Sequence, residues 1–410
     1  MKIIWTVNIP LSAIKKKYAG LENNRGHWIQ NMISDLNLPD KYELHIVHFN
    51  TKVNSYSYVK EGNVVFHVFK QRKWSFLDNY KLEINALIEF VNKINPEIIH
   101  IHGTENFYGL IAQDRGLASK IIISIQGIRY KIWQKYFIDF NEFSLLKYSI
   151  RSFTLQSFLL SYLSWRIGVK NENTILKFCN NYFTRTQFDR AAVLSKNALA
   201  NILISDDHRK IRTVFEKNQW LLSESNKTRF VSIVSSSPFK GIFFLLDIVA
   251  RVKMVFPDFH LSVVGKLEPP YLSKIGNLLK KLNIEGSVTL TGALDESRLL
   301  QVFKESRGFL FASYADNSSN SLQEALLFGM PSIAFFSGGN GTLIQNNKTG
   351  LLCPEGDSEY FSSLIVELIE NDKKCNEFST NARNEMIAKQ KFPSSGRYVK
   401  IYENFVAKSI

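Results

Sequence analysis

Short apolar runs alternate with helical patterns along the first half of the chain. The apolar runs span residues 3–7, 44–49, 64–69, 98–101 and 121–125. Segments with apolar residues at helical spacing span 28–36, 82–94 and 110–117. A strand that is apolar throughout is covered on both faces, so this pattern predicts a parallel sheet with helices on each side. We therefore expect a doubly wound α/β domain.

The same alternation begins again in the second half. Its apolar runs span 230–234, 261–264, 288–290, 308–311 and 332–335, and helical patterns span 243–255 and 322–328. The polar segment 223–228 between the halves is the expected linker, so the domains are predicted as 1–222 and 223–388. Two such domains facing each other would form a central cleft, with ligands at the carboxyl ends of the strands.

Residues 128–177 form an aromatic-rich and partly basic helical insertion in the first domain. Its most apolar part, 153–165, is shorter than the roughly 20 residues that a membrane-spanning helix needs, so we expect no span. Two interpretations remain open: the segment packs on the first domain, or it contacts an apolar and anionic boundary through its aromatic side chains and Arg151, Arg166 and Lys170.

Composition narrows the class of protein. The chain has 410 residues, enough for two cores, and its formal net charge of +14 attracts nucleotides, anionic membranes or nucleic acid. No nucleic-acid motif accompanies the charge, which argues against that partner. The three cysteines are far apart and indicate neither a disulfide framework nor a metal cluster. The first residues lack the pattern of a signal peptide, so we expect a cytoplasmic protein.

Two carboxylates stand eight residues apart in the segment DNSSNSLQEALLFGMP, at Asp316 and Glu324. The segment resembles the paired-acid motif, a Glu, seven residues, then a Glu, of retaining GT-B glycosyltransferases of family four, the glycosyl transferases group 1 type. The resemblance implies that Glu324 binds the ribose of a nucleotide-sugar donor and Asp316 the donor sugar, with helix-start amides at Ser319 and Asn320 facing an anion. A structural alternative is that both acids favour the helix dipole.

The segment SSSPFKG follows the first strand of the second domain and resembles the family's diphosphate-binding turn. Lys240 and Gly241 match this turn, but the position of a usual arginine reads Ser235. Because charge on the departing diphosphate must be stabilised, another group should compensate. Candidates are Arg185, Arg209 and the hydroxyls of Ser235 and Ser236. Alternatively, Lys240 is a solvated lysine of the first helical turn.

Glycines at two strand ends also match family positions. Gly265 and Gly292 each follow a strand, where a side chain would block the approach of a ligand, although plain turns would also explain them. The segment 337–341, SGGNG, resembles the loop that lies over the donor sugar, where backbone amides can bind hydroxyls or phosphate.

The first domain departs more from the family pattern. The loop after its first strand, 20–28, keeps Gly26 and adds Arg25 on the expected acceptor side. Arg25 either binds phosphate or is a solvated loop arginine. The strand IIHIH ends in His102, a candidate catalytic residue or a hydrogen-bonded core histidine. Gln126 stands where many relatives have histidine, and it could bind a hydroxyl group but not titrate.

The segments YFTRTQFDR and DDHR resemble a bacterial surface-polysaccharide branch of the family. Here Arg185 either faces the donor or forms a structural ion pair with Asp189 or Asp207. The resemblance covers nearly the whole chain, and residues 389–410 correspond to the helix that crosses back to the first domain.

The resemblance implies a retaining glycosyltransferase in which the leaving phosphate accepts the proton of the acceptor. No bound metal and no cofactor are expected, since Lys240 and helix amides would carry the phosphate charge. The expected partners are a nucleotide-sugar donor and a saccharide or polyprenyl-linked acceptor, with peripheral contact at the inner face of the cell membrane left open. The alternatives are a catalytically decayed GT-B binding protein and a sugar-nucleotide epimerase.

Overall fold

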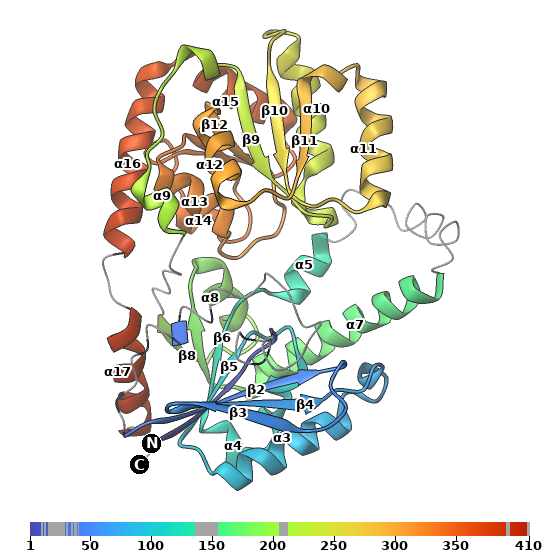
Figure 1. The fold of residues 1–410 in the computed structure, drawn as a ribbon, viewed down its shortest axis with the longest axis vertical. Coiled ribbons are helices and arrows are strands. Elements are labelled where there is room, and N and C mark those ends of the chain that lie inside the picture. The colour runs from blue at the N-terminus through green and yellow to red at the C-terminus, as the bar shows by residue number, and fades with distance from the viewer. Residues whose placement is uncertain are drawn as a thin grey trace. The chain divides into compact units, whose positions relative to one another are not determined.

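The computed structural model describes residues 1–9, 11, 14, 29, 32, 33, 36, 39, 41–135, 155–204, 212–390 and 394–407. The chain divides into two compact units. Unit 1 contains residues 1–130, 156–210 and 392–410, and unit 2 contains 131–155 and 211–391. Each unit is built on one sheet (Figure 1).

The sheet of unit 1 has eight strands in the order β3-β4-β2-β1-β5-β6-β7-β8. They are β1 (Lys2–Thr6), β2 (Glu43–Asn50), β3 (Ser57–Glu61), β4 (Val64–Lys70), β5 (Ile98–His102), β6 (Ile121–Ser124), β7 (Asn181–Thr184) and β8 (Asn201–Ile204). The five predicted strands are all present. The predicted parallel sheet is confirmed, and the unpredicted edge strand β3 adds to it by pairing antiparallel with β4.

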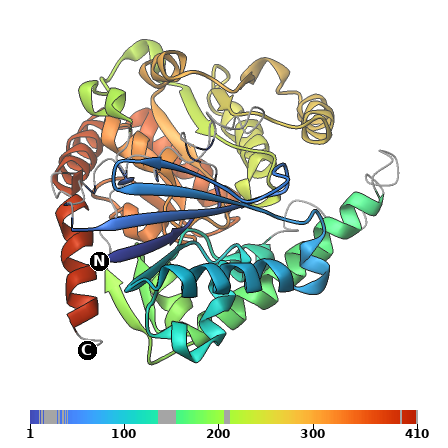
Figure 2. The same ribbon diagram turned by 60° about the horizontal axis from the view of Figure 1, so that its bottom comes forward.

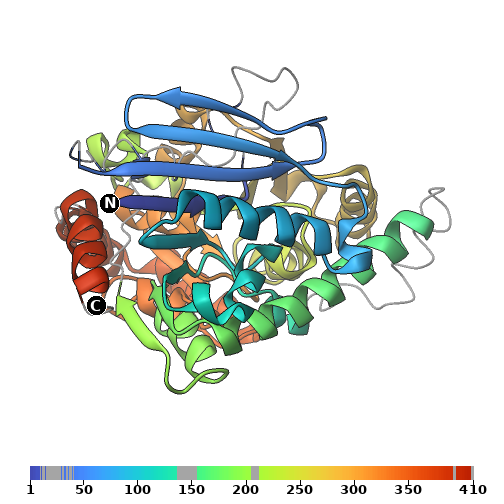
Figure 3. The ribbon, with the colours of Figure 1, turned by 90° about the horizontal axis from the view of Figure 1, so that it is seen from below.

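Helices pack on both faces of this sheet. They are η1 (Ser75–Asp78), α3 (Lys81–Ile94), η2 (Phe107–Gln113), α4 (Arg115–Ala118), α7 (Leu155–Phe178), α8 (Gln187–Leu194) and α17 (Ser394–Ala407), and α5 (Arg129–Lys135) spans the boundary between the units. Figures 2 and 3 show α3 and α7 on the same side of the sheet. The single helix predicted at 110–117 is wrong: Asp114 caps a new short helix by accepting a hydrogen bond from the Gly116 amide. Most of the helix predicted at 28–36 lies outside the described residues.

The strands of unit 1 bury alternate residues on opposite faces. Ile99 and Ile101 of β5 pack in a core with α3 and α7, whereas Ile98 packs in a second core with Trp5 and Tyr402 of α17. Because side chains alternate along a strand, both faces of β5 are covered, which explains its uninterrupted apolar sequence. The last helix of the chain is therefore part of the packing of unit 1.

The sheet of unit 2 has six parallel strands in the order β11-β10-β9-β12-β13-β14. They are β9 (Arg229–Ile233), β10 (His260–Val264), β11 (Val288–Gly292), β12 (Gly308–Phe311), β13 (Ser332–Phe335) and β14 (Leu351–Cys353). Its helical segments are α9 (Thr213–Lys217), η3 (Glu224–Asn226), η4 (Pro238–Lys240), α10 (Ile242–Lys253), α11 (Pro269–Leu282), η5 (Glu285–Ser287), α12 (Glu296–Lys304), α13 (Asn320–Phe328), α14 (Asn340–Leu343), α15 (Ser358–Glu370) and α16 (Asp372–Gln390).

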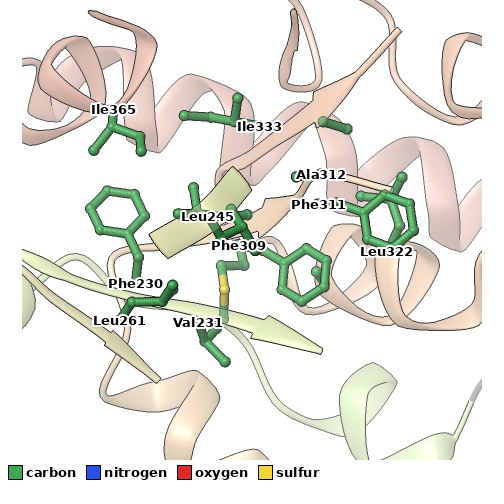
Figure 4. Packing of buried hydrophobic residues seen from close by; sticks show 14 of the residues in the cluster. Phe230, Val231, Leu245, Leu261, Phe309, Phe311, Ala312, Leu322, Ile333 and Ile365 are labelled. Atoms are coloured by element: carbon green, nitrogen blue, oxygen red, sulfur yellow. The ribbon is translucent and has the colours of Figure 1, made fainter. Parts of the chain in front are cut away.

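A continuous apolar core lies between this sheet and its helices. Figure 4 shows Phe230 and Phe309 of the central strands beside Leu245 of α10. Phe215 and Trp220 pack in the same core, although both precede the predicted linker. The indole N–H of Trp220 donates to the Ser306 carbonyl at 3.0 Å, so the segment before β9 is fixed to unit 2.

Both sheets share a reversal of strand order at their first strand. β1 lies between β2 and β5, and β9 lies between β10 and β12, so the chain winds outward in opposite directions from each. In such sheets the loops after the two strands at the reversal separate and leave room for a ligand at the carboxyl edge. The topology thus favours the loops after β9 and β12 as one site.

None of the helices in the described part of the chain is long and apolar enough to cross a membrane.

Candidate functional site

Three loops meet at the carboxyl edge of the second sheet, after β9, β12 and β13. The Tyr314 amide donates to the Phe239 carbonyl at 2.8 Å, which joins the first two loops. The Ser337 hydroxyl donates to the Ser313 carbonyl at 2.5 Å, and the Gly339 amide donates to the Asp316 carbonyl at 2.8 Å. The predicted glycine-rich loop is therefore held directly against the acidic loop.

Lys240 and Asp316 form an ion pair at this edge. The ammonium group of Lys240 contacts Oδ2 of Asp316, so the structure brings together two of the predicted catalytic residues. Their side chains are 23% and 19% exposed, so both remain partly accessible to solvent. The Lys240 ammonium also lies 5.9 Å from the centre of the Phe311 ring, which adds a weak cation–π contact.

Gly241 sets the separation between the first two loops. It has a φ of +70°, and an added Cβ would lie 2.0 Å from the carbonyl oxygen of Ala312. Only glycine combines this left-handed conformation with so close an approach of two backbones. Gly241 thus lets the turn that carries Lys240 lie against the loop that leads to Asp316.

Helix α13 begins directly after the acidic loop. Ser319 is its N-cap, and the Ser319 hydroxyl accepts a hydrogen bond from the Leu322 amide at 3.4 Å. Asn320 is the first helical residue. The first amides of a helix have no acceptor within the helix and carry its partial positive charge, so this end is suited to an anion. The structure therefore places Ser319 and Asn320 next to the loop of Asp316.

Glu324 lies one turn into α13 and forms a bidentate ion pair with Arg212. Nε of Arg212 donates to Oε1 at 2.7 Å, and Nη2 donates to Oε2 at 2.6 Å. The Glu324 side chain is only 8% exposed, whereas that of Arg212 is 40% exposed. Parallel hydrogen bonds between a guanidinium and a carboxylate are among the strongest side-chain pairs. Both oxygens predicted to bind a ribose are thus held by a cation of the same unit.

The remaining residues predicted in unit 2 lie at the same edge. The Ser235 hydroxyl donates to the Ser237 hydroxyl at 3.4 Å, and the Ser236 hydroxyl accepts a hydrogen bond from the Glu268 amide at 2.6 Å. Gly265 lies beside the loop after β9, because an added Cβ would lie 2.0 Å from the Val234 carbonyl oxygen. Ser236 is already used to hold the loop after β10.

His102 ends β5 in unit 1 and is fully buried. Burial lowers the pKa of His102 to about 3, with a further lowering by the charge of Arg185. The imidazole is therefore neutral near pH 7, and its ring lies edge-on to Trp5 with centroids 4.6 Å apart. The catalytic role of His102 stays a prediction.

Arg185 follows β7 at the carboxyl edge of the first sheet. Its Nη2 donates to the Ile125 carbonyl at 2.7 Å, and its amide donates to the Asp189 carboxylate at 2.8 Å. Asp189 completes a capping box with Thr186 at the start of α8. Arg185 thus orders the ends of β6 and β7, and its donor contact is untested. The predicted Arg25, Gly26 and Arg209 lie outside the described residues.

The described ranges contain no cluster of three His, Cys, Asp or Glu side chains that could hold a metal ion.

Two family sequence models match the chain. One, described as "Glycosyl transferases group 1", matches residues 214–385, the region that carries Lys240, Asp316 and Glu324. The other, described as "Glycosyl transferase 4-like", matches residues 23–156. Residues 214–385 thus belong to the group 1 glycosyl transferases. In this glycosyl transferase, Lys240 and Asp316, which the sequence motifs single out, are in contact at the carboxyl edge of the second sheet.

Two relatives have the same residue as this glycosyl transferase at about a quarter of the aligned positions. An uncharacterized glycosyltransferase of Haemophilus influenzae is 26% identical over 206 residues, which are 50% of this chain and 56% of that protein. The poly(ribitol-phosphate) α-N-acetylglucosaminyltransferase of Staphylococcus aureus is 25% identical over 225 residues, 54% of this chain and 42% of that protein. The matches thus span about half the length of these relatives.

Solved structures show the same GT-B fold over almost the whole chain. Sucrose-phosphate synthase of Thermosynechococcus elongatus superposes with a TM-score of 0.71 at 14% identity, covering 99% of both chains. HepE of Anabaena, solved with UDP-glucose, superposes with a TM-score of 0.60 at 16% identity, covering 100% of this chain and 99% of HepE. At such identities the likeness concerns the fold.

Arg212 is the residue that the sequence did not single out. It follows a polar stretch in which Arg209 was the candidate, and no spacing relates it to Glu324, 112 residues later. Only the packing of α9 against α13 places the two side chains together.

Proposed function

We propose that this glycosyl transferase moves a sugar from a nucleotide-sugar donor, with retention, to a saccharide or lipid-linked saccharide acceptor. The observation that carries the proposal is the contact of Lys240 with Asp316 at the reversal point of the second sheet, beside the start of α13. A cation, two carboxylates and helix amides at one strand edge suit a nucleoside diphosphate linked to a sugar.

Each group has a distinct role in this proposal. Lys240 binds the donor diphosphate together with the amides at Ser319 and Asn320, Glu324 accepts the ribose hydroxyls, and Asp316 binds the donor sugar. Lys240 and Asp316 are paired in the structure, so donor binding exchanges their mutual contact for contacts to phosphate and sugar. Stabilising the charge on the departing diphosphate would be the main contribution to rate.

Retention is proposed from the resemblance to retaining enzymes. In such a transfer the acceptor hydroxyl attacks the anomeric carbon on the face that the diphosphate leaves. The bond from carbon to phosphate oxygen breaks, the new glycosidic bond forms, and the proton of the hydroxyl passes to the departing phosphate. The enzyme positions these groups and needs no protein base in this scheme.

The comparisons support a choice of partners. HepE was solved with UDP-glucose, and the S. aureus relative transfers N-acetylglucosamine to poly(ribitol-phosphate), so we propose a UDP-sugar donor and a cell-surface polymer or its lipid-linked precursor as acceptor. A location in the cytoplasm with peripheral membrane contact belongs to the same proposal. The second candidate, a decayed binding protein, is favoured by serine at position 235 in place of arginine.

The test is a thermal-shift titration with UDP-, GDP-, ADP- and dTDP-sugars on the wild type, on Glu324→Ala and on the control Glu305→Ala. Glu305 is an exposed glutamate of unit 2. A ligand at about 100 times its dissociation constant stabilises the folded state by roughly 2.7 kcal/mol. We expect one nucleotide to shift the wild type and the control but not Glu324→Ala. No shift with any nucleotide would contradict the proposal, and a shift without acceptor-dependent release of nucleoside diphosphate would favour the binding protein.

A further inference from the structure

A ribose that binds Glu324 competes with Arg212 for the same two carboxylate oxygens. Both carboxylate oxygens accept a hydrogen bond from the Arg212 guanidinium, at 2.7 and 2.6 Å. Ribose hydroxyls donate hydrogen bonds to a carboxylate and would need these oxygens. Since Glu324 is buried and held on α13, the side chain that yields is the more exposed one, Arg212.

The backbone that carries Arg212 is firmly held, so the exchange concerns the side chain alone. Arg212 is the N-cap of α9, and Phe215 of this helix is fully buried. Arg383 of α16 donates to the carbonyls of Glu216 at 2.6 Å and Asn218 at 2.8 Å, which fixes the far end of α9. A guanidinium released from Glu324 therefore stays tethered next to α13.

A released guanidinium needs another anion, and the donor brings one. The diphosphate is joined to the ribose that takes the place of Arg212, and the planar fork of arginine matches two phosphate oxygens. Lys240 supplies one cation at the turn after β9, where Ser235 stands in place of the usual arginine. Arg212, released from Glu324, would add a second cation to that of Lys240.

We propose that Arg212 is a phosphate-binding residue of the donor site, which neutralises Glu324 while the site is empty and turns to the diphosphate when the ribose displaces it. This inference rests on the proposed function, because it assumes that Glu324 binds a ribose. The exchange makes ribose and diphosphate binding interdependent: a nucleoside alone must break the ion pair without offering Arg212 a new partner. A nucleoside diphosphate replaces the lost contact.

The test compares a nucleoside diphosphate with its nucleoside, UDP and uridine in the first instance, by calorimetric titration of the wild type, Arg212→Gln and the control Arg251→Gln. Arg251 pairs with Asp247 on the surface of α10, so its variant changes the net charge equally. We expect Arg212→Gln to weaken UDP binding by about ten- to hundredfold, the effect of losing a charge-assisted contact. Uridine should bind it as well as the wild type or better, because Glu324 is free.

Equal weakening of UDP and uridine in Arg212→Gln would overturn the inference, since a purely structural role disturbs both ligands alike. An unchanged UDP affinity would overturn it as well. If Arg212→Gln fails to fold, Arg212→Lys replaces it in the test, because lysine keeps the charge but lacks the planar fork of arginine. This variant should bind UDP more weakly than the wild type and uridine equally well. A wild type that binds no nucleoside diphosphate would contradict the proposed function itself, whereas normal UDP binding in every Arg212 variant would contradict only the exchange.

Discussion

The hydroxyl group of Tyr402 lies 2.5 Å from Nδ1 of His100, in the buried interior of unit 1. The same hydroxyl accepts a hydrogen bond from the Trp5 indole at 3.2 Å, and the other ring nitrogen of His100 lies 2.6 Å from the Ser124 hydroxyl. A chain of polar contacts therefore links α17 to β1, β5 and β6. Buried networks of this kind are stable only when every member keeps its partners.

Replacing Tyr402 by phenylalanine should loosen α17 and the strands beneath it. The change leaves Nδ1 of His100 and the indole N–H of Trp5 without a hydrogen-bond partner, which costs about 1–3 kcal/mol. Hydrogen exchange of the peptides that cover β1 and β5 measures this loss locally. Lys400→Ala, an exposed change on the same helix, should leave these rates unaltered. Equal protection in Tyr402→Phe and the wild type would show that the network contributes nothing.

Glu172 should make unit 1 less stable as the pH rises. This carboxyl is fully buried on α7, where it accepts hydrogen bonds from the Thr104 hydroxyl at 2.6 Å and the Tyr130 amide at 2.8 Å. Burial raises the pKa of Glu172 from 4.5 to about 7. Between these values the folded state holds a proton that the unfolded state has lost. Its stabilising effect is complete below pH 4.5 and is lost as the pH rises through 7.

Glu172→Gln should remove this dependence. The amide can accept from Tyr130 and donate to Thr104, whose hydroxyl donates to the Gly127 carbonyl at 3.3 Å. Between pH 5 and pH 8 the free energy of unfolding of the wild type should fall by up to about 3 kcal/mol more than that of the variant. Calorimetric melting from pH 5 to 8 measures the difference. Glu89→Gln, on the exposed side of α3, should follow the wild type; parallel curves for Glu172→Gln would show that the carboxyl is ionised throughout.

Lys240→Ala should abolish most of the turnover but should hardly lower the stability of the fold. The lysine is partly exposed, so its removal leaves Asp316 in contact with water and costs little stability. The leaving diphosphate, in contrast, loses the cation that would stabilise its charge. We expect turnover to fall on the order of a hundred- to a thousandfold. Release of nucleoside diphosphate in the presence of acceptor is the measurement, with Lys304→Ala on α12 as the control. Turnover within a few-fold of wild type would remove Lys240 from the mechanism.

Gly241→Ala should disturb the site more than Gly292→Ala. Both glycines have a φ of +70°, so both variants carry the same backbone strain, of about 1–2 kcal/mol. Only at Gly241 would the new methyl group meet a backbone oxygen, whereas nothing lies within 4 Å at Gly292. Donor binding should therefore weaken in Gly241→Ala and persist in Gly292→Ala. Nucleotide titration of both variants measures this difference. Equal affinities would mean that the loops after β9 and β12 can move apart without weakening donor binding.

Most strands with both faces buried were predictable, although the four-residue strand β7 was not predicted despite its burial. A predictable strand shows as an unbroken apolar run, as in β5, where all five residues are buried. Strand β3 escaped prediction because it forms the edge of its sheet and none of its five residues is buried, so its sequence SYVKE has no apolar run. Burial, rather than strand formation as such, is what the hydrophobic pattern reports.

Contacts of the site were predictable only where they follow from strand order. Lys240 and Asp316 follow β9 and β12, which are neighbours in a sheet of this type, and the family motif names both residues. Arg212 follows no strand of the second sheet and meets Glu324 because α9 packs on α13. Neither charge nor spacing in the sequence indicates such a packing contact.

The position of α17 has a consequence for the order in which the protein can mature during synthesis. Trp5, His100 and Ser124 leave the ribosome early, yet Tyr402 of the helix that covers them is made only after every strand of unit 2. The part of this face that α17 packs on therefore stays uncovered while nearly three hundred further residues are translated, a count set by the distance from Ser124 to Tyr402. During that interval the nascent first sheet presents an apolar surface on which chaperones can act.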